Sequence, residues 1–363
     1  MAQISGDMVE GLDCPVGASF LQSAMWIQFF GNGTSRSDPS QARGFKLACV
    51  FESNGYEGSS WRHTQLLNRQ VSGRPKRMLV IRAIGTVGNY DYITEVFLGE
   101  DGGIQVREAF AGYPEIDRLY EVSRPPNWGS IVHADSGPRG HLVQNLHSHY
   151  CAFKVDLDIL GTANEFQVTK LRYQNATSPR SVGQKVQETQ RIVKEDPNME
   201  FVATAQAPGI WHIVNAKAQN RRNGAPRGYA VVVGSAPSVN RYSKSHPYAA
   251  SATFARRHLA VAKRKEQESA ATSVTDFYPV AEPLLSVDRF LSDRESLIGE
   301  DLVCWVSIGK EHVARAEDQP LISNFAVDFS LLPWNYHEQN PEMVLAMAGK
   351  GPETWISATE LRR

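Results

Sequence analysis

Short runs of apolar, β-branched and aromatic residues recur along the chain, and clusters of Gly, Pro, Asn and Asp separate them. Runs of this kind, bounded by turn residues, are typical of the strands of an all-β sandwich. The pattern therefore predicts an all-β fold. The runs are Arg77 to Ile84, Tyr92 to Leu98, Ile104 to Phe110, Tyr150 to Ile159, Glu165 to Tyr173, Gly228 to Val233, Asp301 to Ile308 and Phe325 to Leu332.

One turn between two of these runs is specific enough to predict a pairing. Asp101-Gly102 separates them, and an Asp-Gly pair between strands is a strong hairpin signal. We therefore expect the strand that holds Tyr92 to turn directly into the strand that holds Val106.

Three other segments have a composition compatible with helix. The first two lack a sustained apolar stripe of helical period and are interpreted as strands or long loops, whereas the third can contain a short helix. These segments are Gln184 to Met199, Ala249 to Ser269 and Ala281 to Gly299. We find no repeat, low-complexity tract or convincing linker, so residues 1–363 are interpreted as a single domain.

The charge balance narrows the class of partners. The chain has 38 lysines and arginines against 39 aspartates and glutamates. A net charge this close to zero favours neither nucleic acid nor an anionic membrane as a partner. A small-molecule substrate is the remaining expectation, and it has to be argued from a site.

Targeting signals are not evident in the sequence. Residues 1–20 carry three acidic residues and no basic region before an apolar stretch, which argues against a signal peptide. No apolar run approaches the roughly 18 residues of a membrane span. The last three residues are not a peroxisomal signal. An intracellular, cytoplasmic protein is therefore the expectation.

Cysteine usage argues against a cysteine-rich scaffold. Cys14, Cys49, Cys151 and Cys304 are too few and too dispersed for a disulfide framework or a zinc knuckle. Cys151 and Cys304 lie in apolar, strand-like segments, which predicts that both are buried thiols.

The sharpest candidate for chemistry is His147-Ser148-His149, at the start of an alternating run. Side chains at i and i+2 of a strand point to the same face, about 7 Å apart, so both imidazoles can reach one metal ion. The alternative is a pair of solvent-facing or hydrogen-bonded histidines, and the triplet alone does not decide between them.

A second candidate is the segment from Ile84 to Tyr92, in which Gly88-Asn89 interrupts a strand just before Tyr90. Taken alone, this pattern is typical of a β-bulge followed by two aromatic side chains on one face.

Together the two segments resemble the copper-containing amine oxidases. That family has an Asn-Tyr-Asp/Glu-Tyr motif, whose first tyrosine becomes the quinone cofactor, and a His-x-His pair that binds copper. Asn89-Tyr90-Asp91-Tyr92 matches the first motif, and His147-Ser148-His149 matches the second. The flanking segments Arg74 to Met78 and Gly140 to Val143 are similar to the family as well.

The family also places a third histidine far downstream, in a segment of the form Trp-x-x-x-Gly-x-x-His-x-x-Arg-x-Glu-Asp-x-Pro. The resemblance implies that His312 is the third copper ligand. The matching residues are Trp305, Gly309, His312, Arg315, Glu317, Asp318 and Pro320. With a drifted form of the family's closing segment from Asp328 to Pro341, the resemblance spans about residues 10 to 345. The remaining histidines are interpreted as surface or hydrogen-bonded side chains: His63, His133, His141, His212, His246, His258 and His337.

The resemblance carries expectations for fold, cofactor and reaction. It implies a large twisted antiparallel β-sandwich of the copper amine oxidase type, a supersandwich that pairs as a homodimer. It implies Cu²⁺, topaquinone made from Tyr90, and Asn89 as the residue that orients the ring. The implied reaction is the oxidative deamination of a primary amine by O₂ to an aldehyde, ammonia and hydrogen peroxide.

Two further features are implied by the same resemblance. One is a disulfide between Cys14 and Cys49. The other is a second, peripheral metal site for Ca²⁺ or Mn²⁺, since carboxylates and carbonyls are the ligands that hard cations prefer. Its implied ligands are Asp156 and Asp301 with the backbone carbonyls of Leu157 and Leu302; an ordinary pair of strand-end carboxylates is the alternative.

The sequence also departs from the family's pattern. The family's catalytic base is an aspartate in a Tyr-x-Asp-x-Gly-like segment upstream of the stretch that Gly11 to Cys14 resembles. The sequence begins after that point, and Asp7 lacks the flanking Tyr and Gly. The chain is therefore interpreted as a truncated catalytic domain without the family's small N-terminal α/β domains. Leu146 and Lys310-Glu311 are further departures close to the copper ligands.

Two functions follow from these observations. One is copper- and topaquinone-dependent amine oxidation, with impaired turnover. The alternative is a repurposed relative that binds or cyclises another small molecule in a specialised biosynthetic pathway without quinone chemistry. The retained histidines and Asn89-Tyr90 favour metal binding, and the missing base favours changed chemistry.

Overall fold

A computed structural model describes residues 7–25, 43–67, 71–119, 127–135, 140–174, 184–203, 209–234, 239–273 and 283–342. The chain divides into two compact units, each assembled from separated stretches. The first comprises residues 1–145, 314–326 and 341–363, and the second comprises residues 146–313 and 327–340. The interpretation of residues 1–363 as one domain stays a prediction.

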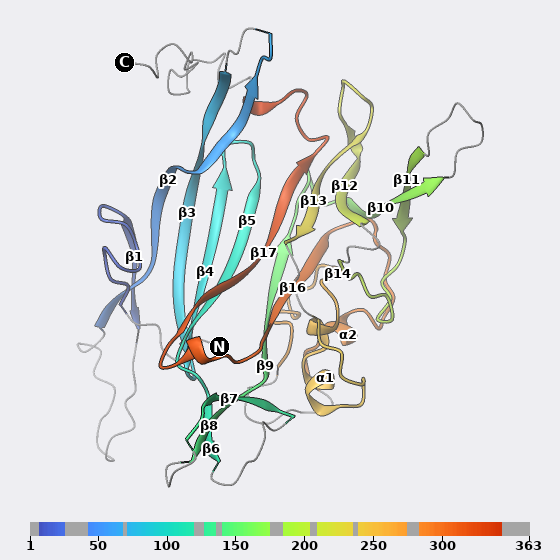
Figure 1. The fold of residues 1–363 in the computed structure, drawn as a ribbon. Coiled ribbons are helices and arrows are strands. Elements are labelled where there is room, and N and C mark those ends of the chain that lie inside the picture. Colours follow the sequence, from blue (N-terminus) through green and yellow to red (C-terminus); the bar gives the residue numbers. More distant parts are fainter. Residues whose placement is uncertain are drawn as a thin grey trace, which may run out of the picture. The chain divides into compact units, whose positions relative to one another are not determined.

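The first unit is built on an antiparallel meander in which each strand pairs with the next (Figure 1). Its β-branched and aromatic runs form long strands, as their strand propensity predicts. The strands are β1 (Ser19–Met25), β2 (Arg43–Thr64), β3 (Val71–Val87), β4 (Tyr90–Gly99) and β5 (Ile104–Gly112). A separate sheet pairs β8 with both β6 and β7; these strands are β6 (Ile116–Leu119), β7 (Gly129–His133) and β8 (His141–Asn145).

The predicted hairpin between the strands of Tyr92 and Val106 is confirmed. β4 and β5 pair from Tyr90 opposite Gly112 to Leu98 opposite Ile104. At the turn, Asp101 accepts a hydrogen bond from the Gly103 amide at 2.9 Å, and Gly102 has φ 83°. A positive φ is favourable for glycine because it has no Cβ, which explains the Asp-Gly signal.

The implied disulfide between Cys14 and Cys49 is present in the first unit. Both residues are buried with Met8 in a small apolar cluster. The two remaining cysteines are free thiols, and Cys304 is buried as predicted whereas Cys151 is partly exposed.

The second unit contains the sheet that carries the candidate metal ligands. Its order is β14-β16-β9, formed by Leu259–Lys263, Leu302–His312 and His147–Asp156. The strand β16 is buried along most of its length, which matches its nearly continuous apolar run from Leu302 to Ile308. Trp305 and Phe290 belong to the apolar cluster that packs on this sheet.

A further antiparallel series in the second unit runs β13-β12-β10-β11, and β15 pairs with β10. These strands are β10 (Asn164–Gln174), β11 (Gln184–Ile192), β12 (Gly209–Gln219), β13 (Pro226–Val233) and β15 (Ile298–Glu300). The part of β17 (Ile322–Trp334) that lies in this unit pairs with β13, with Phe329 opposite Val233.

The three ambiguous segments have different outcomes. The first contains β11 and confirms the strand interpretation. The third contains the short helix α2 (Val287–Phe290), whose N-cap Ser286 accepts from the Arg289 amide. The second was interpreted too simply, because it begins within helix α1 (Pro247–Ser251) and continues through the 3₁₀ turn η2 (Thr253–Arg256) before β14.

The helix in the second segment has a local cause that the apolar pattern does not show. His246 caps α1 by accepting from the Tyr248 amide, and Pro247 takes the first helical position. One more 3₁₀ turn, η3 (Ala316–Asp318), precedes β17. Across the described part of the chain, no helix combines the length and the apolar character needed to cross a membrane.

Candidate metal centre

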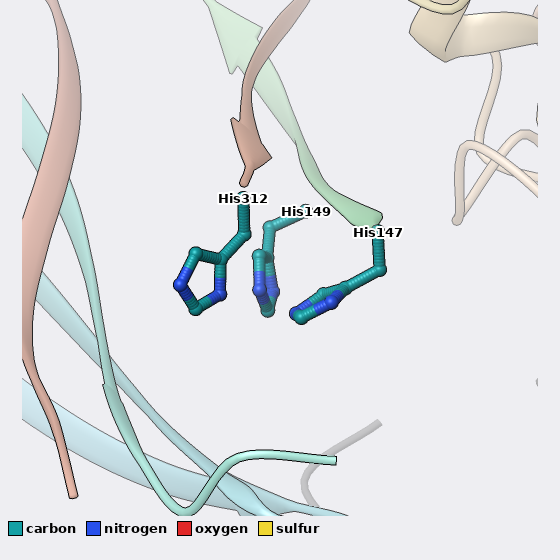
Figure 2. Close-up of side chains that lie close together, drawn as sticks. All are labelled: His147, His149 and His312. Carbon is teal, nitrogen blue, oxygen red and sulfur yellow. The ribbon is translucent and has the colours of Figure 1, made fainter. Parts of the chain in front are cut away.

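Three imidazoles converge at one end of the β9–β16 pair in the second unit (Figure 2). His147 and His149 occupy alternate positions of β9 and therefore share a face. His312, the last residue of β16, lies directly opposite His147 in the antiparallel register. The i, i+2 spacing and this register together place all three side chains on one side of the sheet.

The geometry is that of a potential metal site. Each histidine offers one ring nitrogen, and these nitrogens all lie within 4.8 Å of one another. The ring centroid of His147 is 4.9 Å from that of His149 and 4.9 Å from that of His312. His149 and His312 are only 5% and 8% exposed. The arrangement favours the metal-binding interpretation of the His-x-His triplet over a solvent-facing pair.

The electrostatics keep the buried imidazole in the form that binds metals. Burial, together with the neighbouring His147 and His312, lowers the pKa of His149 to about 3. A neutral imidazole has a free lone pair, and it suits copper, zinc, iron or nickel. A donor set of three imidazoles therefore fits Cu²⁺.

The opposite face of the same strands carries a polar contact between them. Ser148 donates to Glu311 at 2.5 Å, and the Tyr150 hydroxyl donates to the other carboxylate oxygen of Glu311 at 3.0 Å. Ser148 and Glu311 are directly opposed in the register. Glu311, which the sequence marks as a departure from the family, thus joins β16 to β9 next to the histidines.

Tyr90 lies in the first unit, at the start of β4, and is 3% exposed. It pairs with Val87 and with Gly112. A Cβ on Gly112 would lie 2.1 Å from the Asn89 carbonyl oxygen, so only glycine permits this close approach. The Tyr113 amide donates to that same oxygen at 2.9 Å. The chain is therefore tightly folded around the Asn89-Tyr90 step.

The surroundings of Tyr90 keep its phenol protonated. Burial raises the pKa of Tyr90, and the charges of Glu115, Tyr92 and Asp318 raise it further. Asp318 is itself buried and accepts from the Arg315 amide at 3.1 Å. Asn89 is exposed, and its predicted role in orienting the ring stays a prediction. The sequence offered no signal that the charge of Glu115 raises the pKa of Tyr90.

The implied peripheral site contains one carboxylate more than expected. Asp156, Asp158 and Asp301 each offer an oxygen, and these oxygens lie within 4.8 Å of one another. Asp158 was missed from sequence, although it follows Asp156 at the i+2 spacing that identified the histidines. Leu157 lies between these two aspartates, and Leu302 begins β16 directly after Asp301.

A cationic side chain reaches the same carboxylates. Arg264 donates to Asp156 at 2.9 Å and approaches Asp301 at 3.7 Å. Oδ1 of Asp301 is buried and has no hydrogen-bond partner within the described ranges. Three carboxylates, one of them with a buried oxygen that accepts no hydrogen bond from the described residues, fit a hard cation. Arg264 already supplies part of the positive charge that such an ion would bring.

A third group of carboxylates forms ion pairs with a neighbouring lysine. Glu195, Asp293 and Glu295 lie close together. The Lys265 ammonium is 2.5 Å from Asp293 and 2.5 Å from Glu295. This group is therefore explained as an internal ion-pair network.

Comparison with known proteins identifies the family to which this chain belongs. A family model described as the enzyme domain of copper amine oxidases matches residues 1–350. The chain belongs to the copper amine oxidase family. Its all-β architecture agrees with that family, and the predicted β-sandwich is confirmed.

Individual relatives match nearly all of the chain. It is 27% identical over 355 residues to a putative copper-containing amine oxidase of Margaritifera margaritifera, a match that covers 93% of this chain and 42% of that protein. It is 28% identical over 351 residues to the lung isozyme of primary amine oxidase from Bos taurus, covering 94% and 43%. The chain thus spans less than half the length of these curated relatives.

Solved structures give the same result. The chain matches Pichia pastoris lysyl oxidase with a TM-score of 0.77 and 26% identity, covering 93% of this chain and 44% of that one. It matches a copper-containing benzylamine oxidase of Hansenula polymorpha with a TM-score of 0.78 and 18% identity, covering 94% and 50%. At that identity the second likeness concerns the fold alone.

Proposed function

We propose that this chain carries the copper and quinone centre of an amine oxidase and oxidises a primary amine with O₂. The observation that carries the proposal is the convergence of His147, His149 and His312 on one point, in a chain whose family is that of the copper amine oxidases. The balanced reaction is RCH₂NH₂ + O₂ + H₂O → RCHO + NH₃ + H₂O₂.

In this proposal the three histidines hold Cu²⁺ through one ring nitrogen each. His149 needs no deprotonation to bind it, because burial has already lowered its pKa to about 3. The ion and the quinone derived from Tyr90 would supply the redox chemistry, because an unmodified tyrosine side chain cannot accept electrons from the substrate. Glu311 keeps β9 and β16 in register from the opposite face.

The residues around Tyr90 set its starting state. Burial and the nearby carboxylates Glu115 and Asp318 favour the neutral phenol. A metal cation opposes this effect, because coordination lowers the pKa of a bound acid. Conversion of Tyr90 is therefore expected to depend on added copper, and the metal-free chain is expected to keep an ordinary tyrosine at this position.

The proposed substrate class is a primary amine. Two kinds are to be tested: the ε-amine of a lysine side chain, which the name of the matched Pichia pastoris lysyl oxidase suggests, and benzylamine as a simple primary amine. We further propose a second, hard cation, Ca²⁺ or Mn²⁺, at Asp156, Asp158 and Asp301, and a homodimer as the working assembly.

The proposal is tested by loading the chain with copper in air and supplying each amine. The expected result is aldehyde and hydrogen peroxide in equal amounts, both lost in Tyr90→Phe and in His149→Ala. His133→Ala changes an exposed histidine of β7 and serves as the matched control. Equal turnover by wild type and Tyr90→Phe would rule out the quinone route.

A further inference from the structure

A cavity in the second unit lies among α1, η2 and α2 and belongs to none of the sites described above. Its volume is about 380 Å³, which is within the range of small-molecule pockets. Small apolar residues form part of its wall. Its polar lining comes from Lys244, Thr253, Arg256, Ser286, Asp288 and Arg289.

Two buried hydroxyl groups in this lining have a proton left to donate. Thr253 and Ser286 are 7% and 6% exposed. Oγ1 of Thr253 accepts from the Asp288 amide at 3.2 Å, and Oγ of Ser286 accepts from the Arg289 amide at 3.3 Å. A hydroxyl also has one hydrogen to donate, and within the described ranges neither hydroxyl has an acceptor for it. Each can therefore donate to an acceptor inside the cavity.

Positive charge surrounds these donors. Lys244 and Arg289 are exposed, and neither side chain forms an ion pair with any residue that the structure describes. Arg256 is 5% exposed and binds Asp288 at 2.7 Å and Glu200 at 2.9 Å. Its guanidinium is thus fixed in place at the cavity wall.

Among the lining residues that the structure describes, Asp288 is the one carboxylate, and both of its oxygens already bind arginines. Oδ2 of Asp288 binds Arg256, and Oδ1 binds the fully buried Arg257. Two arginines share this single aspartate, so its charge does not offset Lys244 or Arg289. The described lining residues consequently present surplus hydrogen-bond donors and surplus positive charge, and none of them offers a free carboxylate to a cation.

We propose that this cavity is a binding site for a small molecule carrying an oxyanion, a phosphate or carboxylate group. Thr253 and Ser286 donate their hydroxyl protons to the anion, and Lys244 and Arg289 neutralise its charge. Hydrogen bonds to a charged group are stronger than neutral ones, and the buried floor strengthens them further because the local dielectric is low. The site needs neither copper nor Tyr90, so it is independent of the amine oxidase proposal.

The proposal is tested by titrating the full chain with inorganic phosphate and, separately, with succinate. Calorimetry is carried out at constant ionic strength set with sodium chloride, which removes general screening effects. Saturable binding of one equivalent is expected. Binding of phosphate alone assigns a phosphate ligand, and binding of succinate alone assigns a carboxylate ligand. The absence of saturable binding by either anion would overturn the proposal.

Variants place the binding in the cavity. Lys244→Ala/Arg289→Ala removes two exposed cations without breaking an ion pair of the described residues, and we expect it to weaken binding at least about tenfold. Lys170→Ala/Lys217→Ala removes the same charge from exposed positions of β10 and β12 and should bind like wild type. Circular dichroism confirms the fold of both. Equal weakening in the two double variants would show general charge attraction and would contradict the assigned site.

Discussion

His312 lies directly opposite His147 in the antiparallel pair of β16 and β9, and their ring centroids are 4.9 Å apart. Successive side chains of a strand alternate between the two faces of the sheet. A register slip of one residue would therefore turn His312 to the face opposite that of His147 and His149. The metal centre therefore depends on register as much as on residue type. Glu311, hydrogen-bonded to Ser148 and Tyr150, links the two strands beside these histidines.

Removal of His312 should abolish tight copper binding. His312→Ala leaves two imidazoles on β9, and we expect the affinity for Cu²⁺ to fall by more than about 100-fold, because loss of even an outer-sphere partner costs about 10- to 100-fold. Competition with a chelator of known affinity measures the change. His133→Ala, on an exposed position of β7, should retain wild-type affinity, and tight binding by His312→Ala would contradict the assignment of this ligand.

Removal of the Glu311 carboxylate should have a smaller effect on the same site. Glu311→Ala loses two hydrogen bonds between the strands, each worth about 0.5 to 1.5 kcal/mol. We expect the affinity for copper to fall about two- to tenfold, because the ligands are held less precisely. Glu311→Gln keeps an acceptor for Ser148 and is the control. Indistinguishable affinities in Glu311→Ala and wild type would show that the contact has no positioning role.

The sequence alone identified the parts of the centre that lie within one strand. The i, i+2 spacing was enough to place His147 and His149 on one face, whereas His312 was found only through the family resemblance. No local pattern fixes the register of two strands so far apart in the chain, and the pairing of β9 with β16 does so.

Other features were missed for similar reasons. Asp158 has the same i+2 relation to Asp156, but exposed carboxylates are common without a metal ion, so the spacing alone does not mark a site. The helix α1 follows from a histidine cap and Pro247, which local chemistry sets without an apolar stripe. Glu115 raises the pKa of Tyr90 because the fold brings the two residues close together. The sequence around an exposed loop carboxylate does not reveal which residues lie near it.

Glu108 should make the stability of the chain depend on pH. It is 3% exposed on β5, and burial raises its pKa to about 7. The folded state therefore binds this proton more tightly than the unfolded state. The resulting stability is complete below the unfolded pKa, near 4.5, and is lost as the pH rises through about 7.

The variant Glu108→Gln removes that titration. Its free energy of unfolding should exceed that of wild type by about 1 to 3 kcal/mol at pH 8 and approach it at pH 4.5. Urea denaturation at the two pH values measures the difference. Glu317→Gln changes an exposed carboxylate and serves as the control. A constant difference at both pH values would refute the linkage.

Arg264 should compete with a cation at the peripheral carboxylates. Its guanidinium lies 2.9 Å from Asp156 and 3.7 Å from Asp301. We expect Arg264→Ala to bind Ca²⁺ about tenfold more tightly than wild type, because a competing charge is removed. Arg172→Ala, which removes an arginine from the exposed Glu188, should leave Ca²⁺ affinity unchanged. Weaker Ca²⁺ binding by Arg264→Ala would show that Arg264 assists the ion.

The conversion of Tyr90 tests the central claim most directly. The metal-free chain is reconstituted with Cu²⁺ in air, its visible spectrum is recorded, and phenylhydrazine is added, with Tyr90→Phe treated in parallel. The account predicts a quinone band and a phenylhydrazine adduct that appear only with copper and only in the wild-type chain. Tight copper binding by the three histidines without any Tyr90-dependent band would contradict it and would leave a metal site without quinone chemistry.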